Sequence, residues 1–359
     1  MIKLLVVEDS PVVREFLVYI LKSDPEIDVI GVARNGEEAL EFVNARRPDV
    51  ITMDINMPRM NGFDTTRRIM ETSPVPIVIV SGSWNTAEMA TTFRALEAGA
   101  VAVLARPTGL GHPDHEANAK ELIQTVKLMS EVKVIRRWPR RRTAAWESLS
   151  RPIFSSLRER EALSPPRDIR AAAIGASTGG PIVLQTILSR LPKDLPFPIL
   201  IVQHIAPGFL TGFAEWLSST TGFPAQIAAQ DEPMAPGRAY LAPDGWQMGV
   251  KSRGRIHLSP GDAEYGVCPS VSFLFRSMAN VFGANAAGIL LTGMGKDGAE
   301  ELRIMKEQGA LTIVQDEESS VVYGMPGEAI RLHAAHSVLS PEEIASALEQ
   351  LSREVRIKS

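Results

Sequence analysis

The stretch AAIGASTGGPIVLQTILSRL (172–191) passes from a short apolar run through a glycine-rich turn into a helical pattern. Pro181 stands directly after the turn, where a proline suits the first turn of a helix because its missing N–H would have no partner there. A strand that runs through a tight turn into a helix is the repeating unit of parallel α/β sheets. The sequence therefore predicts an α/β domain in this half of the chain, with Ser177 exposed at the strand-to-helix turn.

The turn also contains the pattern Gly-x-Ser-x-Gly, made by Gly175, Ser177 and Gly179. Glycines allow a substrate to approach the backbone closely, and a helix N-terminus stabilises negative charge that develops beside it. Glycine-rich strand-to-helix turns also bind phosphate groups, although this one lacks the lysine of a P-loop. The motif alone therefore leaves three interpretations open: a nucleophile, a phosphate-binding loop and a structural turn.

Two further apolar runs end in residues that would complement a serine nucleophile. PILIVQH (198–204) ends in His204, and AAGILLTGMGKDG (286–298) leads into a glycine-rich loop that carries Asp297. The carboxyl ends of parallel strands share one edge of a sheet, so Ser177, His204 and Asp297 are predicted to lie together. In such a triad the histidine takes the serine proton and the aspartate orients the imidazole. The chain order Ser, His, Asp differs from that of α/β-hydrolases, and we expect a different doubly wound fold with a mostly parallel sheet.

The first 130 residues repeat the same kind of pattern. Short, nearly continuous apolar runs alternate with amphipathic helical stretches, which predicts a buried parallel sheet of five strands. These runs are Lys3–Glu8, Asp28–Ala33, Asp49–Asp54, Ile77–Ser81 and Val101–Ala105.

Polar residues gather at the predicted carboxyl ends of these strands. Glu8 and Asp9 follow the first run, and Asp54 ends the third. Carboxylates that converge need a cation, and a set of oxygen ligands favours Mg²⁺. An aspartate beside Mg²⁺ can accept a phosphoryl group, which Ser81 and Arg106 at the next strand ends could contact. The sequence thus predicts a Mg²⁺ site of Glu8, Asp9 and Asp54, with phosphorylation at Asp54.

Composition limits the remaining possibilities. The net charge of −4 carries no overall nucleic-acid signature, and the single cysteine, Cys268, cannot form an internal disulfide. No apolar run is long enough for a membrane span and the N-terminus lacks a secretory pattern, so we expect a cytoplasmic protein without membrane insertion. Between Lys133 and Arg170, 11 Lys and Arg stand against 4 Asp and Glu. This basic stretch is interpreted as a tether, with a docking patch for an acidic partner as the alternative.

The first half resembles a known family. LLVVEDS (4–10), PDVITMDINMPRMNG (48–62), IVIVSGS (77–83) and VAVLARP (101–107) are similar to the receiver domain of two-component response regulators, a flavodoxin-like (CheY-like) fold. The resemblance implies that a histidine kinase phosphorylates Asp54, that Glu8, Asp9 and Asp54 hold Mg²⁺, and that Ser81 and Arg106 act as switch residues. Arg106 replaces the family's lysine, and Val103 stands at its aromatic switch position.

The second half resembles the CheB family of chemotaxis methylesterases. The similarity is carried by ASTGG (176–180), VQHIAPGF (202–209), PSVSFLF (269–275), LLTGMGKDGA (290–299) and TIVQDEESSVVYGMP (312–326). It implies Ser177, His204 and Asp297 as the catalytic triad, and Thr178 and Met294 at the oxyanion hole. Cys268 stands where the family commonly has an arginine. The expected organisation is a receiver at 1–130, a basic linker at 131–167 and a methylesterase domain at 168–352.

The two resemblances together imply a phosphorylation-regulated serine hydrolase. Its expected reactions are removal of methyl esters from receptor glutamates and deamidation of receptor glutamines, with no cofactor at the esterase site. The implied partners are methyl-accepting chemotaxis receptors and a CheA-type histidine kinase, without nucleic acid. Two alternatives stay open: a receiver-controlled hydrolase for a non-chemotactic target, and a signalling adaptor with little esterase activity. DNA binding is disfavoured because the second half has a parallel α/β pattern and no helix-turn-helix.

Overall fold

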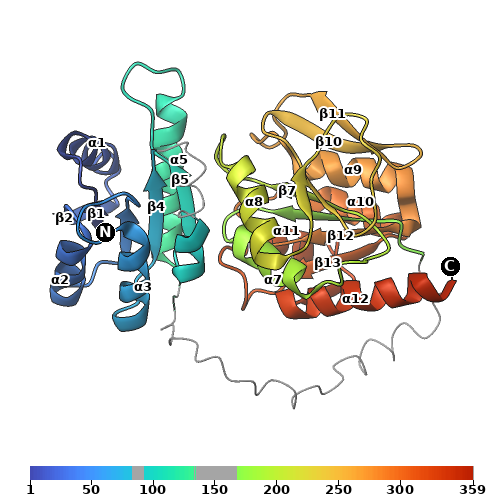
Figure 1. Cartoon of the computed structure of the whole chain (residues 1–359). Helices are drawn as coiled ribbons and strands as arrows, with labels where there is room; N and C mark the ends of the chain where they lie inside the picture. The colour runs from blue at the N-terminus through green and yellow to red at the C-terminus, as the bar shows by residue number, and fades with distance from the viewer. Residues whose placement is uncertain (83–92, 133, 135–167, 359) are drawn as a thin grey trace, which may run out of the picture.

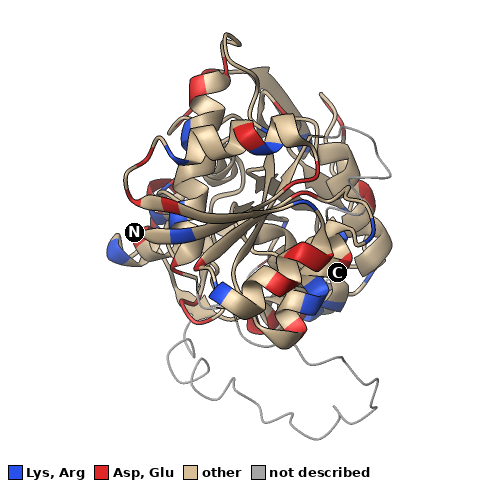
Figure 2. Cartoon of the chain, turned by 90° about the vertical axis from the view of Figure 1, so that its left-hand side faces the viewer, with Lys and Arg blue, Asp and Glu red and all other residues tan. Residues whose placement is uncertain are grey.

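The computed structural model describes residues 1–82, 93–132, 134 and 168–358, which form two α/β units side by side (Figure 1). The basic stretch predicted as a linker lies almost wholly outside the described residues. Among those residues, no helix combines the length and apolar character needed to cross a membrane. In the view of Figure 2, acidic and basic residues are interspersed over the face of the first unit rather than sorted by sign.

The first unit is built on a five-stranded sheet with the order β2-β1-β3-β4-β5, in which every pair is parallel. Helices on its two faces bury alternate strand residues: Leu4 and Val6 pack with α1 and α5, whereas Leu5 and Val7 pack with α2 and α3. The predicted five-stranded parallel sheet is confirmed, with strand bounds within one residue of the apolar runs. The elements are β1 (Ile2–Val7), α1 (Pro11–Leu21), β2 (Ile27–Ala33), α2 (Gly36–Arg46), β3 (Val50–Met53), α3 (Gly62–Thr72), β4 (Ile77–Ser81), β5 (Ala102–Ala105) and α5 (His115–Ser130).

The second unit contains a seven-stranded sheet with the order β14-β13-β12-β6-β7-β9-β8, again with parallel pairs. Ala172 and Ile174 face a core with α7, α8 and α12, and Ala171 and Ala173 face a core with α9, α10 and α11. The predicted doubly wound architecture is therefore confirmed. Its strands are β6 (Ala171–Ala176), β7 (Ile199–Gln203), β8 (Ala225–Ile227), β9 (Ala239–Leu241), β12 (Ala286–Leu290), β13 (Leu311–Gln315) and β14 (Ser337–Leu339).

The remaining elements of the second unit are helices and one hairpin. β10 (Trp246–Lys251) and β11 (Arg255–Pro260) form a separate antiparallel hairpin that packs against α9. The helices are α7 (Gly180–Arg190), α8 (Leu210–Thr221), α9 (Val271–Phe282), α10 (Ala299–Glu307), α11 (Met325–Arg331) and α12 (Pro341–Lys358), with a short 3₁₀ turn, η1 (Gly283–Asn285), between α9 and β12.

Aromatic packing joins the two units. Phe93, in the helical residues 93–98, stacks on Trp216 of α8 with ring centroids 5.3 Å apart, and it also contacts Phe213. The Glu97 carboxylate accepts hydrogen bonds from Trp216 Nε1 at 3.1 Å and Gln185 Nε2 at 2.8 Å. The first unit is thereby held against α7 and α8, the helices that follow β6 and β7, and these strands end directly before Ser177 and His204.

Candidate active site

Ser177 follows β6 directly, in the turn that leads into α7. Its N–H donates to the Thr292 carbonyl at 3.0 Å, and its carbonyl accepts the Gly180 N–H at 2.8 Å. Gly179 adopts φ +81°, a left-handed conformation that glycine takes without steric cost. Gly293 must also lack a side chain, because a Cβ there would lie 2.7 Å from the Ser177 Cβ. The predicted strand-to-helix turn is present, and its backbone is held from two sides.

His204 follows β7, the neighbour of β6 in the sheet, and Asp297 lies in the loop after β12, the neighbour on the other side. The His204 Nε2 is 3.0 Å from Asp297 Oδ2. Since Nε2 is engaged by the carboxylate, Nδ1 is the ring nitrogen left for a serine proton. His204 and Ser177 line the same cavity. The three residues predicted from separate apolar runs thus stand at three adjacent strand ends.

Asp297 is buried in a cradle at the N-terminus of α9. Its Oδ1 accepts from Ser270 Oγ and Ser272 N, both at 2.9 Å, and its Oδ2 accepts from Val271 N at 2.7 Å. Burial alone would raise the pKa of Asp297, but hydrogen bonds from His204 and Ser272 and the His204 charge hold that pKa below its ordinary value. The carboxylate therefore stays ionised and fixes the imidazole.

The two residues at the predicted oxyanion hole lie next to this pair. Thr178 follows Ser177 directly, and its carbonyl accepts from Thr292 Oγ1 at 2.9 Å. Met294 follows Gly293, and the residue is 44% exposed. Within the described parts of the chain, the backbone N–H groups of Thr178 and Met294 donate to no protein acceptor. Both residues line the cavity beside Ser177, so both N–H groups are available to a substrate oxygen there.

The cavity, of about 450 Å³, lies between the two units. Its walls on the catalytic side include Tyr265 and Cys268, and burial raises the pKa of the Cys268 thiol, so the sulfur stays protonated at neutral pH. The opposite wall comes from the first unit. It consists of Val101, the β5 residues Ala102–Leu104, and side chains of α5 and of the helical residues 93–98. The first unit therefore restricts access to Ser177.

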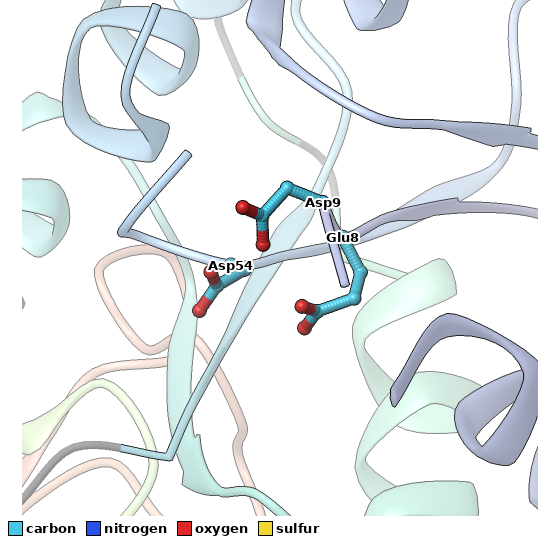
Figure 3. Close-up of side chains that lie close together, drawn as sticks. All are labelled: Glu8, Asp9 and Asp54. Atoms are coloured by element: carbon cyan, nitrogen blue, oxygen red, sulfur yellow. The ribbon is translucent and has the colours of Figure 1, made fainter. Parts of the chain in front are cut away.

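The predicted metal-binding acids come together at the carboxyl end of the first sheet. Each of Glu8, Asp9 and Asp54 places a carboxylate oxygen within 4.8 Å of the others, and Figure 3 shows these groups around one space. Glu8 and Asp54 are buried, whereas Asp9 is exposed. Burial, with the Asp54 charge nearby, raises the pKa of Glu8 to about 7, against the opposing effect of Arg106. Burial likewise raises the pKa of Asp54 to about 6. The site therefore carries more negative charge than Arg106 offsets, which suits a divalent cation.

Arg106 supplies a positive charge to this acidic group. One terminal nitrogen, Nη2, lies 3.2 Å from Glu8 Oε2 and 3.6 Å from Asp54 Oδ1. The Arg106 Nε is buried and finds no partner among the described residues.

The other two switch positions lie on the neighbouring strands. Ser81 is buried at the end of β4, and its carbonyl accepts the backbone N–H of Arg106 at 2.9 Å. Val103 is half-buried on β5 and packs against the core that contains Phe93.

Some residues that brace the site were not predicted from the sequence. Ser270 and Gln247 support Asp297, because Gln247 Oε1 accepts the Ser270 N–H at 2.8 Å. Gln203 donates to the Ser177 and His204 carbonyls, at 2.8 and 2.7 Å. A signal was present for Gln203, since it is a polar residue inside an otherwise apolar strand run. For Gln247 and Ser270 the relevant contacts span 23 residues and depend on the tertiary fold.

Comparisons with known proteins agree with this arrangement. Residues 172–348 match the family described as CheB methylesterase, and residues 4–112 match the response regulator receiver domain. A protein-glutamate methylesterase/protein-glutamine glutaminase of Nitrosospira multiformis is 57% identical over 99% of this chain and 98% of its own. A relative of the same name from Syntrophus aciditrophicus is 55% identical over 99% of both chains.

A solved structure agrees with the assignment of the second unit. The Thermotoga maritima CheB methylesterase catalytic domain is 36% identical, with a TM-score of 0.50 over 51% of this chain and 98% of its own. The receiver match thus covers the first half of the chain, and the methylesterase match covers the second half. The chain belongs to the CheB family of receiver-linked protein-glutamate methylesterases.

Proposed function

We propose that the chain hydrolyses γ-methyl esters of glutamate on methyl-accepting chemotaxis receptors and deamidates specific receptor glutamines. One observation carries the residue assignment: the His204 imidazole is fixed by Asp297 at 3.0 Å, in the cavity that Ser177 lines. We place the receiver at 1–130 and the esterase domain at 168–352, joined by the basic stretch 131–167.

The reaction begins when Ser177 Oγ attacks the ester carbonyl and His204 Nδ1 takes its proton. Asp297 holds Nε2 and stabilises the positive charge that forms on the ring. The N–H groups of Thr178 and Met294 donate to the oxyanion, a role that Ser177 N–H cannot fill because it is bonded to Thr292. Nδ1 then returns the proton to the departing methanol, or to ammonia when glutamine is the substrate. A water attacks the acyl-enzyme by the reverse steps and releases the glutamate.

The receiver is proposed to control this site through phosphorylation of Asp54 by a CheA-type histidine kinase. Glu8, Asp9 and Asp54 would hold Mg²⁺, which when bound neutralises charge on the transferred phosphoryl group. Arg106 can grip phosphate oxygens with its planar guanidinium. Since β5 and α5 wall the cavity, a shift in this face would open the way to Ser177.

Phosphorylation is expected to raise esterase activity only when residue 54 is an aspartate. Methanol release from methylated receptor is measured with and without a small-molecule phosphodonor, for wild type and for Asp54→Asn. We expect stimulation in wild type and none in the variant, because the amide cannot accept the phosphoryl group. Equal rates in all four measurements would show that the receiver does not act through Asp54.

The affinity of the receiver for Mg²⁺ is expected to rise with pH up to about neutrality. Burial raises the pKa of Glu8 from 4.5 to about 7, so the folded state binds the Glu8 proton more tightly than the unfolded chain does. This proton binding stabilises the fold fully below about pH 4.5. The stabilisation is lost as the pH rises through 7. Metal ligation needs the deprotonated carboxylates and releases their protons. Calorimetric titration of the full chain with Mg²⁺ should give tighter binding at about pH 7.5 than at about pH 5.5, by roughly tenfold or more. Equal affinities at the two pH values would contradict the raised pKa.

A further inference from the structure

Gln203 is the last residue of β7 and lies beside Ala176 in the sheet register. It is 4% exposed, and its amide nitrogen donates two hydrogen bonds, to Ser177 O at 2.8 Å and His204 O at 2.7 Å. One side chain thus joins the backbone of the proposed nucleophile to that of the proposed base.

The buried amide oxygen of Gln203 indicates that this side chain does more than fill space in the core. Gln203 Oε1 is buried and has no hydrogen-bond partner among the described residues. Such an atom destabilises a fold, and an apolar side chain of the same length would avoid it. It is accommodated beside the first residue of α7, where a Cβ on Gly180 would lie 2.2 Å from Oε1. The positive end of the α7 dipole partly offsets the lost hydrogen bond.

The consequence for the oxyanion hole follows from peptide geometry. The Ser177 carbonyl and the Thr178 N–H belong to one planar trans peptide, so they point in opposite directions. Gln203 Nε2 and Gly180 N both donate to that carbonyl, each at 2.8 Å, and fix the plane. Fixing the carbonyl therefore fixes the direction of the Thr178 N–H. Donation to the carbonyl also polarises the peptide and strengthens its N–H as a donor.

We propose that Gln203 is a positioning residue that aims the Thr178 N–H at the substrate oxyanion and holds the His204 backbone in register with it. This inference rests on the proposed roles of Ser177, Thr178 and His204. A preorganised donor acts mainly in the transition state, because charge on the substrate oxygen develops there. The loss of Gln203 should therefore lower kcat and leave KM nearly unchanged.

The test compares Gln203→Met with wild type in the full-length chain, activated by phosphodonor, with methylated receptor as substrate. We expect kcat to fall by about 10- to 100-fold and KM to change by less than about twofold. Thr312→Val is the matched control. Thr312 lies on β13, a strand of the same sheet, its buried hydroxyl contacts His336, and it does not line the cavity. This control should lose thermal stability while its kcat stays within about twofold of wild type.

Gln203→Glu adds a readout that a packing role would not move. An ionised glutamate cannot donate to either carbonyl, whereas its protonated form can donate once. The kcat of this variant relative to wild type should therefore fall as the pH rises. If Gln203→Met keeps wild-type kcat while Ser177→Ala is inactive, the positioning role is wrong and the triad stands. Activity in Ser177→Ala would instead show that Ser177 is not the nucleophile and that the proposed triad is wrong.

Discussion

Replacement of Ser177 by alanine is expected to lower kcat for receptor demethylation by about 10⁶-fold. The hydroxyl is the atom that forms the acyl-enzyme, and the Cys268 thiol in the same cavity stays protonated at neutral pH because burial raises its pKa. The fold should tolerate the change, because the Cβ that packs against Gly293 is kept and the backbone bonds to Thr292 and Gly180 do not involve the side chain. Methanol release from methylated receptor under single-turnover conditions measures the loss.

Ser189→Ala is the matched control for this variant. Ser189 is an exposed serine on α7, the helix that Ser177 precedes, and its hydroxyl bonds only locally to the Thr186 carbonyl. Its activity should equal that of wild type, and both variants should melt within a few degrees of wild type. Demethylation by Ser177→Ala at a measurable fraction of the wild-type rate would show that Ser177 is not the nucleophile.

The sequence predicted most of what places the site, because apolar runs and the residues that end them are local signals. β4 has the bounds of the run Ile77–Ser81, and Ser177 and His204 each follow their strand directly. Parallel strands bring such end positions to one edge, so the grouping could be expected before any contact was known. The acidic group of Glu8, Asp9 and Asp54 was predictable for the same reason.

The unpredicted part depends on contacts between distant segments. No local pattern assigns the partner of each imidazole nitrogen, yet the contact of His204 Nε2 with Asp297 decides that Nδ1 is the base. The α9 N-terminus that holds Asp297 lies 25 to 27 residues earlier in the chain. The packing of Phe93 on Trp216 joins two units whose apolar patterns each look complete alone. Strand periodicity carries no information about such pairings.

Replacement of Asp297 by asparagine is expected to lower kcat by about 10⁴-fold and to reduce folding stability by about 1–3 kcal/mol. All four hydrogen bonds to this carboxylate are donated to it, two at each oxygen. An amide must turn its NH₂ toward one of these donor pairs. If NH₂ faces His204, the imidazole accepts at Nε2 and carries its proton on Nδ1, so it cannot take the Ser177 proton.

In this orientation the NH₂ also opposes the Val271 N–H, and if it faces Ser270 and Ser272 instead it opposes the Ser272 N–H. Either orientation sets two donors against each other at the start of α9, which accounts for the loss of stability. Steady-state kinetics and denaturant unfolding of Asp297→Asn measure the two effects. Asp316→Asn serves as the control, because this aspartate also accepts a backbone N–H, from Ser319, in the loop after β13, and does not line the cavity. Its kcat should match wild type. A loss of less than tenfold in Asp297→Asn would mean that His204 keeps its working tautomer without the carboxylate, and the triad would reduce to Ser177 and His204.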